Sequence, residues 1–216
     1  MNIICHRIDY YSQNNINLID SYIKKGITSF EIDIQLCKDE IVIFHDFSLT
    51  SKGINKNVSE FPLEQLEKYG IYSIDKLFSL LTNYSKVNIF LDLKGFNEKL
   101  IGKLYEKLIN IDLSKNTFYI QSFNHYFINL LKKLLGNNIK NIFFGYLIGT
   151  YMDIHWHKYI KNIDYLCIDN QFISKFIKKI EKPLYVYNCN SKEELTCESR
   201  FLSGIITDFP FNFKRN

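Results

Sequence analysis

Short runs of β-branched and aromatic residues alternate along the chain with longer stretches of helical spacing, and this alternation limits the fold more than any other feature. A chain of this kind forms repeated β–α units around a parallel sheet. The strands are predicted at 2–5, 29–36, 40–45, 87–94, 117–122, 141–147, 165–169, 184–188 and 204–207. The helices are predicted at 17–25, 62–69, 74–83, 98–110, 125–135, 152–161, 174–180 and 192–199.

The number of strands points to a closed barrel. If 40–45 extends the second β–α unit, eight strands remain, which is the count of a (β/α)8 TIM barrel. The 216 residues are near the lower size limit of that fold, and the 46% that are hydrophobic supply one large core. No low-complexity tract interrupts the pattern. We therefore expect a single domain over residues 1–216.

Two segments of this barrel are predicted to be unusual. Residues 47–72 are inserted between the second unit and the next helix, and their polar beginning at 48–53 has loop composition, so we expect this segment at the C-terminal rim. Only 211–216 follow the last strand motif, which is too short for a full last helix. Phe211 and Phe213 or a neighbouring subunit would then cover that flank, so a homo-oligomer remains open.

Composition limits the classes of binding partner and the cellular compartment that we expect for the chain. The net charge is only +4 and the lysines are spread along the chain, so we expect no nucleic-acid partner. No apolar run approaches the roughly 20 residues that span a bilayer, and residues 1–7 lack the features of a signal peptide. The five cysteines form no Cys-x-x-Cys pair, which favours free thiols. We therefore predict a cytoplasmic protein without a transmembrane segment.

One motif with histidines is interpreted as a surface feature. His155-Trp156-His157 has the residues of a metal site, but it lies on a predicted helix or loop. Positions two apart on a helix face different ways, so the two imidazoles would not converge.

Ionisable residues inside two predicted strands mark a candidate site. Glu31 and Asp33 are two positions apart and therefore lie on the same face of their strand. Asp92 and Lys94 repeat this spacing in a second strand. A strand in a parallel barrel is buried on both faces, so charged side chains are costly there unless they point into the barrel mouth. The two strands are thus predicted to send ionisable groups to one functional site.

Two histidines come where a strand becomes a loop, which in a barrel is the catalytic rim. His6 is followed by Arg7, and His45 is followed by Asp46. Three strand carboxylates suit a hard divalent cation, two imidazoles suit proton transfer, and Arg7 with Lys94 suits an anion. This combination indicates a phosphate ester as the substrate.

Seven short motifs, in order along the chain, resemble those of the glycerophosphodiester phosphodiesterases. The family opens with His-Arg-Gly and continues with a Glu-x-Asp strand, His-Asp, Glu-x-Lys, Ser-Phe, a strand with Trp and Asn, and Thr-Asp-aromatic-Pro. The similar segments here are His6-Arg7, Glu31-Ile32-Asp33, His45-Asp46, Asp92-Leu93-Lys94, Ser122-Phe123, Tyr187-Asn188-Cys189-Asn190 and Thr207-Asp208-Phe209-Pro210. The resemblance covers the chain from His6 nearly to its end.

The resemblance implies a TIM barrel of the phospholipase C-like (PLC-like) phosphodiesterase type, in which the inserted residues 47–72 form a short cap over the glycerol side. It implies hydrolysis of a glycerophosphodiester to glycerol 3-phosphate and an alcohol. Carried over position by position, it makes His6 and His45 the catalytic acid–base pair. It also makes Glu31, Asp33 and Asp92 the ligands of one divalent cation, Mg²⁺ or Ca²⁺.

The same resemblance implies the substrate contacts. Arg7 and Lys94 would contact the phosphate, and Tyr187, which stands where the family has Trp, would offer a flat surface to glycerol or a head group. The expected partner is a small glycerophosphodiester or a lysophospholipid head group.

Departures from the family pattern leave two alternatives open. Ile8, Gln13 and Ser51 stand where the family has Gly, Glu and Arg, and Asp92 stands where it has Glu. Aspartate at that last position resembles the sphingomyelinase D-like relatives, so a lysophospholipid-cleaving phosphodiesterase is the alternative enzyme. The changes in the first loop would also suit a catalytically silent barrel that acts as a binding protein.

Overall fold

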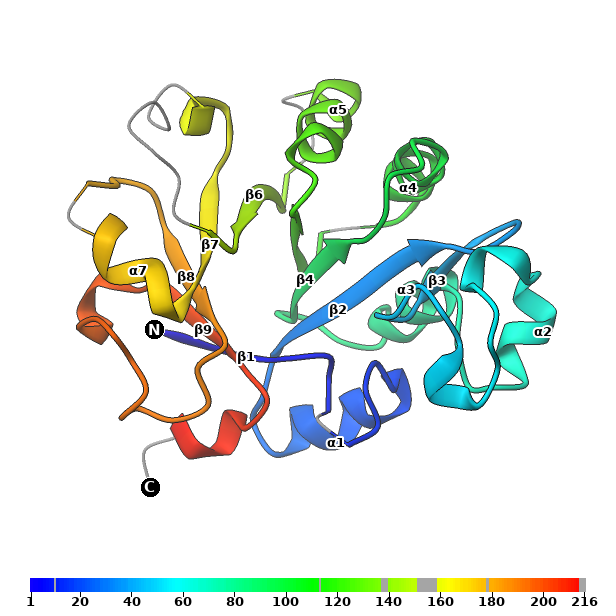
Figure 1. Ribbon diagram of the computed structural model, residues 1–216, viewed down its shortest axis with the longest axis horizontal. Coiled ribbons are helices and arrows are strands. Elements are labelled where there is room, and N and C mark those ends of the chain that lie inside the picture. Colours follow the sequence, from blue (N-terminus) through cyan, green and yellow to red (C-terminus); the bar gives the residue numbers. More distant parts are fainter. Residues whose placement is uncertain (10, 113, 137–139, 151–158, 178, 214–216) are drawn as a thin grey trace.

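Eight parallel strands close into a barrel surrounded by helices (Figure 1). The structure is a computed structural model of the chain, and it describes residues 1–9, 11–112, 114–136, 140–150, 159–177 and 179–213. The barrel strands are β1 (Asn2–Cys5), β2 (Ser29–Leu36), β4 (Asn88–Leu93), β5 (Thr117–Ser122), β6 (Ile142–Ile148), β7 (Tyr165–Asp169), β8 (Leu184–Tyr187) and β9 (Gly204–Thr207). β1 pairs in parallel with both β2 and β9, which closes the ring. The predicted TIM-barrel fold is confirmed.

The ninth strand extends the second unit, as the sequence predicts. β3 (Ile41–Ile43) runs antiparallel to β2 and pairs with its last three residues, Ile34, Gln35 and Leu36. It therefore lies outside the ring, at the C-terminal end of β2.

Helices cover the outside of the barrel. The described α-helices are α1 (Ile19–Lys24), α2 (Leu63–Glu67), α3 (Ile74–Leu81), α4 (Lys99–Asn110), α5 (His125–Leu135) and α7 (Asn170–Phe176). The 3-10 turn η1 (Ile16–Leu18) leads into α1, and η4 (Ile160–Asn162) precedes β7. Most of the predicted helix 152–161 and the whole of His155-Trp156-His157 lie outside the described residues. None of the described helices has the length and apolarity needed to cross a membrane.

Two predicted helices need correction. The helix predicted at 174–180 is α7, which begins four residues earlier because the Asp169 side chain accepts a hydrogen bond from the Gln171 backbone N–H and caps it. The helix predicted at 192–199 is absent: residues 191–198 form bends and turns, and only a 3-10 turn, η5 (Ser199–Phe201), follows.

Asn170 explains the missing helix. Its side chain donates to the Glu194 carbonyl and accepts from the Thr196 backbone N–H, at 2.7 and 3.2 Å. The Thr196 hydroxyl also donates to the Asn170 carbonyl. These backbone groups are thus satisfied by the start of α7 instead of by helical bonds along 192–199.

The barrel interior is filled, so it is not a pore. Phe90 and Tyr119 stack inside it with ring centroids 4.2 Å apart, and Tyr165 meets Phe90 edge-on. Gly145 on β6 leaves the room for Tyr165, because an added Cβ would lie 2.3 Å from that ring. A second apolar layer lies between the strands and the helices. Polar groups can therefore gather only at a barrel mouth.

The segment 47–72 has a small apolar cluster of its own beside β2 and β3 (Figure 1). It contains α2 and the 3-10 turns η2 (Thr50–Lys52) and η3 (Val58–Glu60). Leu49, Val58 and Leu66 are fully buried in this cluster. That this segment caps the substrate, and that 1–216 is one domain, stay predictions.

The flank between β9 and β1 is covered as the sequence predicts. Within the described residues only the 3-10 turn η6 (Pro210–Phe213) follows β9. The Phe211 ring lies 5.7 Å from the Tyr22 ring of α1, centroid to centroid, and Phe213 is buried. Aromatic side chains thus pack where a full last helix would otherwise lie.

Candidate active site

Three carboxylates converge at the C-terminal ends of two neighbouring strands. Glu31 and Asp33 point to the same side of β2, and the register pairs Asp33 with Asp92 on β4. One oxygen from each carboxylate lies within 4.8 Å of the others. All three residues are at least 96% buried, with exposed fractions of 3%, 1% and 4%. The register of β2 and β4 therefore builds an acidic cluster that neither strand could make alone.

Two basic side chains contact this cluster. The Lys94 ammonium nitrogen lies 3.0 Å from Asp33 Oδ1 and 2.5 Å from Asp92 Oδ2. Arg7 Nε lies 3.3 Å from Asp33 Oδ2, and the Arg7 backbone N–H donates to Glu31 Oε2. Arg7 adopts a left-handed backbone with φ of 50°, which turns the chain sharply after β1. The cluster thus has positive charge on its rim.

Asn14 fixes the orientation of Asp33. Its side-chain Nδ2 donates to Asp33 Oδ2 at 3.0 Å, and its side-chain Oδ1 accepts from the Asp33 backbone N–H. Asn14 is one of the buried polar residues. Sequence reasoning gave it no role, although it lies in the loop that follows the His6-Arg7 motif.

His6 is held by a hydrogen-bonded chain of three side chains. His6 Nδ1 lies 2.7 Å from Asp208 Oδ1, and its Nε2 lies 3.8 Å from Glu31 Oε2. The Asn190 side-chain amide donates from Nδ2 to Asp208 Oδ2. Its Oδ1 accepts from the Thr207 hydroxyl and the Asp208 backbone N–H. Sequence reasoning did not assign Asp208 or Asn190 to the site, although both lie in quoted motifs.

His45 has a partner from its own loop. His45 Nδ1 lies 2.7 Å from Asp46 Oδ1. Gln35, at the end of β2, donates to the carbonyls of Phe44 and Asp46, both at 2.8 Å. β2 therefore supplies two carboxylates of the cluster and also fixes the segment that carries His45.

All eight residues singled out in the sequence line one cleft of about 130 Å³. They are His6, Arg7, Glu31, Asp33, His45, Asp92, Lys94 and Tyr187. Tyr187 ends β8, is half-buried, and donates its hydroxyl to the Ile148 carbonyl. The structure thus brings together residues that lie up to 181 positions apart in the chain (187 minus 6).

The carboxylates have unequal proton affinities. Burial and the neighbouring Asp33 raise the pKa of Glu31 to about 8. Burial raises the pKa of Asp92 to about 6, although Lys94 opposes this. The pKa of Asp33 is lowered in spite of its burial, because Lys94, His45 and Arg7 are close. Three buried carboxylates cannot all ionise easily without added positive charge.

The cluster fits a metal ion chemically. Asp92 Oδ1 is buried and has no hydrogen-bond partner among the described residues. An unpartnered buried acceptor that faces two further carboxylates is the arrangement that a cation satisfies. Carboxylate oxygens are hard ligands, which suit Mg²⁺ or Ca²⁺.

Comparison with curated proteins finds a relative along nearly the whole chain. No family model matches the chain. The candidate glycerophosphodiester phosphodiesterase YhdW of Bacillus subtilis (strain 168) is 27% identical over 238 aligned positions, which cover 97% of this chain and 95% of that protein.

Solved structures share the fold. A phosphodiesterase of Oleispira antarctica, solved with the product sn-glycerol-3-phosphate, has a TM-score of 0.82 at 20% identity and covers 97% of this chain and 94% of that one. The glycerophosphodiester phosphodiesterase of Thermotoga maritima has a TM-score of 0.73 at 18% identity, with 97% and 96% covered. The near full-length relative and the shared TIM-barrel fold confirm the resemblance of this chain to the glycerophosphodiester phosphodiesterases.

Proposed function

We propose that this chain hydrolyses glycerophosphodiesters to glycerol 3-phosphate and an alcohol, with one divalent cation held by Glu31, Asp33 and Asp92. The observation that carries this proposal is one cleft lined by three carboxylates, two histidines and two basic side chains. Cleavage of a phosphodiester needs charge neutralisation and proton transfer at two oxygens, and this set has groups for both. The Oleispira antarctica relative with bound sn-glycerol-3-phosphate supports the identity of the product.

The carboxylates would hold the cation and the basic residues would hold the substrate. Mg²⁺ or Ca²⁺ bound to Glu31, Asp33 and Asp92 would withdraw charge from the non-bridging phosphate oxygens. Arg7 and Lys94 border these carboxylates and would bind the remaining phosphate charge through charge-assisted hydrogen bonds.

The histidines would move the protons. The Asp208 carboxylate accepts from His6 Nδ1–H, which leaves Nε2 directed into the cleft. His45 has the same relation to Asp46. One imidazole would take the proton of the attacking water or hydroxyl, and the other would protonate the leaving oxygen. The Tyr187 ring would lie against glycerol or the head group, since its hydroxyl is already bonded to Ile148.

The free state of the cysteine thiols bears on the cellular compartment in which the protein works. All five cysteines are free and four are buried, so we propose that the protein works in the reducing cytoplasm.

The proposal is tested by product identification. The purified chain is incubated with glycerophosphocholine, glycerophosphoethanolamine and glycerophosphoglycerol in the presence of added Mg²⁺ or Ca²⁺, with and without EDTA, and the products are resolved by ³¹P NMR. We expect the glycerol 3-phosphate resonance to appear without EDTA and to be suppressed with it. If no diester is cleaved with either added metal, the silent-barrel alternative replaces this proposal.

A further inference from the structure

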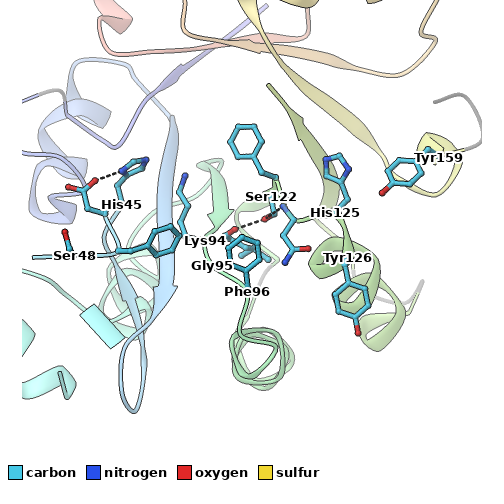
Figure 2. Close-up of a pocket in the computed structure, with 14 residues that line it drawn as sticks. His45, Ser48, Lys94, Gly95, Phe96, Ser122, His125, Tyr126 and Tyr159 are labelled. Carbon is cyan, nitrogen blue, oxygen red and sulfur yellow. Dashed lines mark hydrogen bonds and ion pairs between the residues drawn. The ribbon is translucent and has the colours of Figure 1, made fainter. Parts of the chain in front are cut away.

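A buried glutamine continues the row of carboxylates across the mouth of the barrel. The register aligns Asp33 of β2 with Asp92 of β4, and Asp92 with Gln121 of β5. Gln121 therefore lies beside the acidic cluster, on the same inner side of the sheet. One residue further, the Ser122 hydroxyl donates to the Leu93 carbonyl at 2.6 Å, which ties the ends of β5 and β4 together (Figure 2).

The Gln121 amide is buried, lines the cleft and has a donor to spare. The residue is 1% exposed, and it borders the same cleft as the carboxylates and histidines. Among the described residues its side chain makes one hydrogen bond, in which Oε1 accepts from the Tyr165 hydroxyl at 3.3 Å. A buried amide in this state has its N–H groups left for a ligand.

Tyr165 can reach Gln121 because the position between them has no side chain. The register places Gly145 of β6 between Gln121 of β5 and Tyr165 of β7. A Cβ added to Gly145 would collide with the Tyr165 ring, so this ring fills the space. Burial raises the pKa of Tyr165 well above its usual range, which keeps the hydroxyl protonated and able to donate.

This contact decides which end of the amide faces the cleft. With Oε1 bonded to Tyr165, the Gln121 Nε2 group is directed away from that ring and towards the carboxylates. The reversed amide would set a carbonyl oxygen against carboxylate oxygens, which repel it. Asp92 Oδ1 has no hydrogen-bond partner among the described residues, so Nε2 does not donate to it and remains available.

The other donors of the cleft are engaged in different ways. Tyr187 and Asn188 donate to groups that do not line the cleft. Arg7 and Lys94 pair with the carboxylates, which offset part of their positive charge. Gln121 thus offers an uncharged donor that no carboxylate occupies.

We propose that Gln121 is a further substrate-binding residue, whose Nε2–H donates to a non-bridging oxygen of the phosphate in the cleft. Tyr165 is its positioning residue, because it holds the amide in the donating orientation. The inference rests on the proposed function and adds a residue to that same site. A hydrogen bond to the charged phosphate contributes more than one between neutral groups.

The kinetic test removes the donor and keeps the length of the side chain. In Gln121→Met we expect kcat/KM for glycerophosphocholine to fall about 10- to 100-fold, the usual effect of losing one hydrogen bond to a charged group. The metal-dependent rise in Tm should persist, because the three carboxylates are intact. An unchanged kcat/KM would overturn the inference. Loss of the metal-dependent rise would also overturn it, since Gln121 would then act on the cation.

A pair of tyrosine variants tests the positioning role. Tyr165→Phe should lower kcat/KM about 3- to 10-fold, because the amide loses the hydrogen bond that orients it. Tyr185→Phe is the matched control: Tyr185 is also buried in the barrel, but its hydroxyl bonds to Tyr119. The double variant of Gln121→Met and Tyr165→Phe should be no slower than Gln121→Met alone. Equal effects of the two tyrosine variants, or additive effects in the double variant, would contradict this role.

A binding measurement separates this inference from the proposed function. sn-Glycerol 3-phosphate is titrated by calorimetry into the full chain with Mg²⁺, which needs no turnover. We expect Gln121→Met to bind it at least about tenfold more weakly than wild type. Gln171→Met, which makes the same chemical change on the exposed surface of α7, should bind it as wild type does.

The outcomes of this titration are distinct. Weaker binding by Gln121→Met would support the inference even if wild type cleaved no diester. Equal affinities of wild type and Gln121→Met would overturn it even if diesters were cleaved. No binding by wild type would overturn it as well, because the cleft would then hold no phosphate for Gln121 to contact.

Discussion

Asp208 Oδ1 lies 2.7 Å from His6 Nδ1, across a separation of 202 residues that joins the loops after the first and last barrel strands. Asn190 holds the other oxygen of Asp208, so the carboxylate has one orientation. The pKa of His6 is raised, because the bond to Asp208 and the nearby Glu31 outweigh the opposing effect of burial. Asp208 is therefore a positioning residue for the proposed chemistry.

Replacement of this carboxylate should change the pH profile as well as the rate. In Asp208→Asn the imidazolium loses its anionic partner, so the pKa of His6 should fall. The pH profile limb that reports His6 should move to lower pH, and kcat should fall about 10- to 1000-fold because the tautomer is no longer fixed. A rate change without a shift in the limb would mean that Asp208 acts only structurally. The limb is measured from kcat/KM between pH 5 and 9, with Asp164→Asn as the control.

The proposed metal ligands are tested without turnover. Mg²⁺ or Ca²⁺ at about 100 times its Kd should stabilise the folded chain by about 2.7 kcal/mol, because only the folded state assembles the site. The added metal should therefore raise the Tm of the wild type, and Asp33→Asn should lose this rise. Asp75→Asn, which removes a carboxylate outside the cluster, should retain it. Equal metal-dependent shifts in both variants would place the ion elsewhere.

The buried carboxylates predict how the stability of the metal-free chain depends on pH. The pKa of Glu31 is raised from 4.5 to about 8, so the folded state binds its proton more tightly than the unfolded state. This contribution is fully present below the unfolded value and is lost as pH rises towards 8. Denaturant unfolding of wild type should therefore show stability falling from pH 5 to 8. Glu31→Gln should flatten that fall, and an unchanged slope would show that Glu31 is ionised throughout.

The histidines should be needed for turnover and not for the metal. His45→Ala leaves the three carboxylates intact, so the metal-dependent Tm shift should persist. Its rate should fall by about two to four orders of magnitude, the usual contribution of a positioned acid or base. Steady-state kinetics and thermal scans of the same preparation check both outcomes. Full activity of His45→Ala would remove this residue from the mechanism.

The strands could be predicted closely because local sequence decides them. A barrel strand such as 117–122 is buried among helices and neighbouring strands, so its β-branched and aromatic run is visible directly. In the strand at 29–36, charged residues alternate with isoleucines, and this pattern also revealed Glu31 and Asp33. Residues 192–199, in contrast, have a helical composition, and the contact with Asn170 overrides it.

The site contacts that could not be predicted depend on which loops meet in the folded barrel. Asp208 and Asn190 are ordinary loop residues until the barrel closes and brings them to His6. The sequence therefore revealed the charged centre of the site and left its supporting contacts unseen.

The most direct test of the central claim is a metal titration of activity. Wild type is stripped with EDTA and dialysed, and the release of glycerol 3-phosphate from glycerophosphocholine is measured as Mg²⁺ or Ca²⁺ is added. The cluster of Glu31, Asp33 and Asp92 predicts negligible activity at first and saturable recovery with one of the ions, with no recovery in Asp33→Asn. Full activity of the stripped wild type, or equal recovery in Asp33→Asn, would contradict the account.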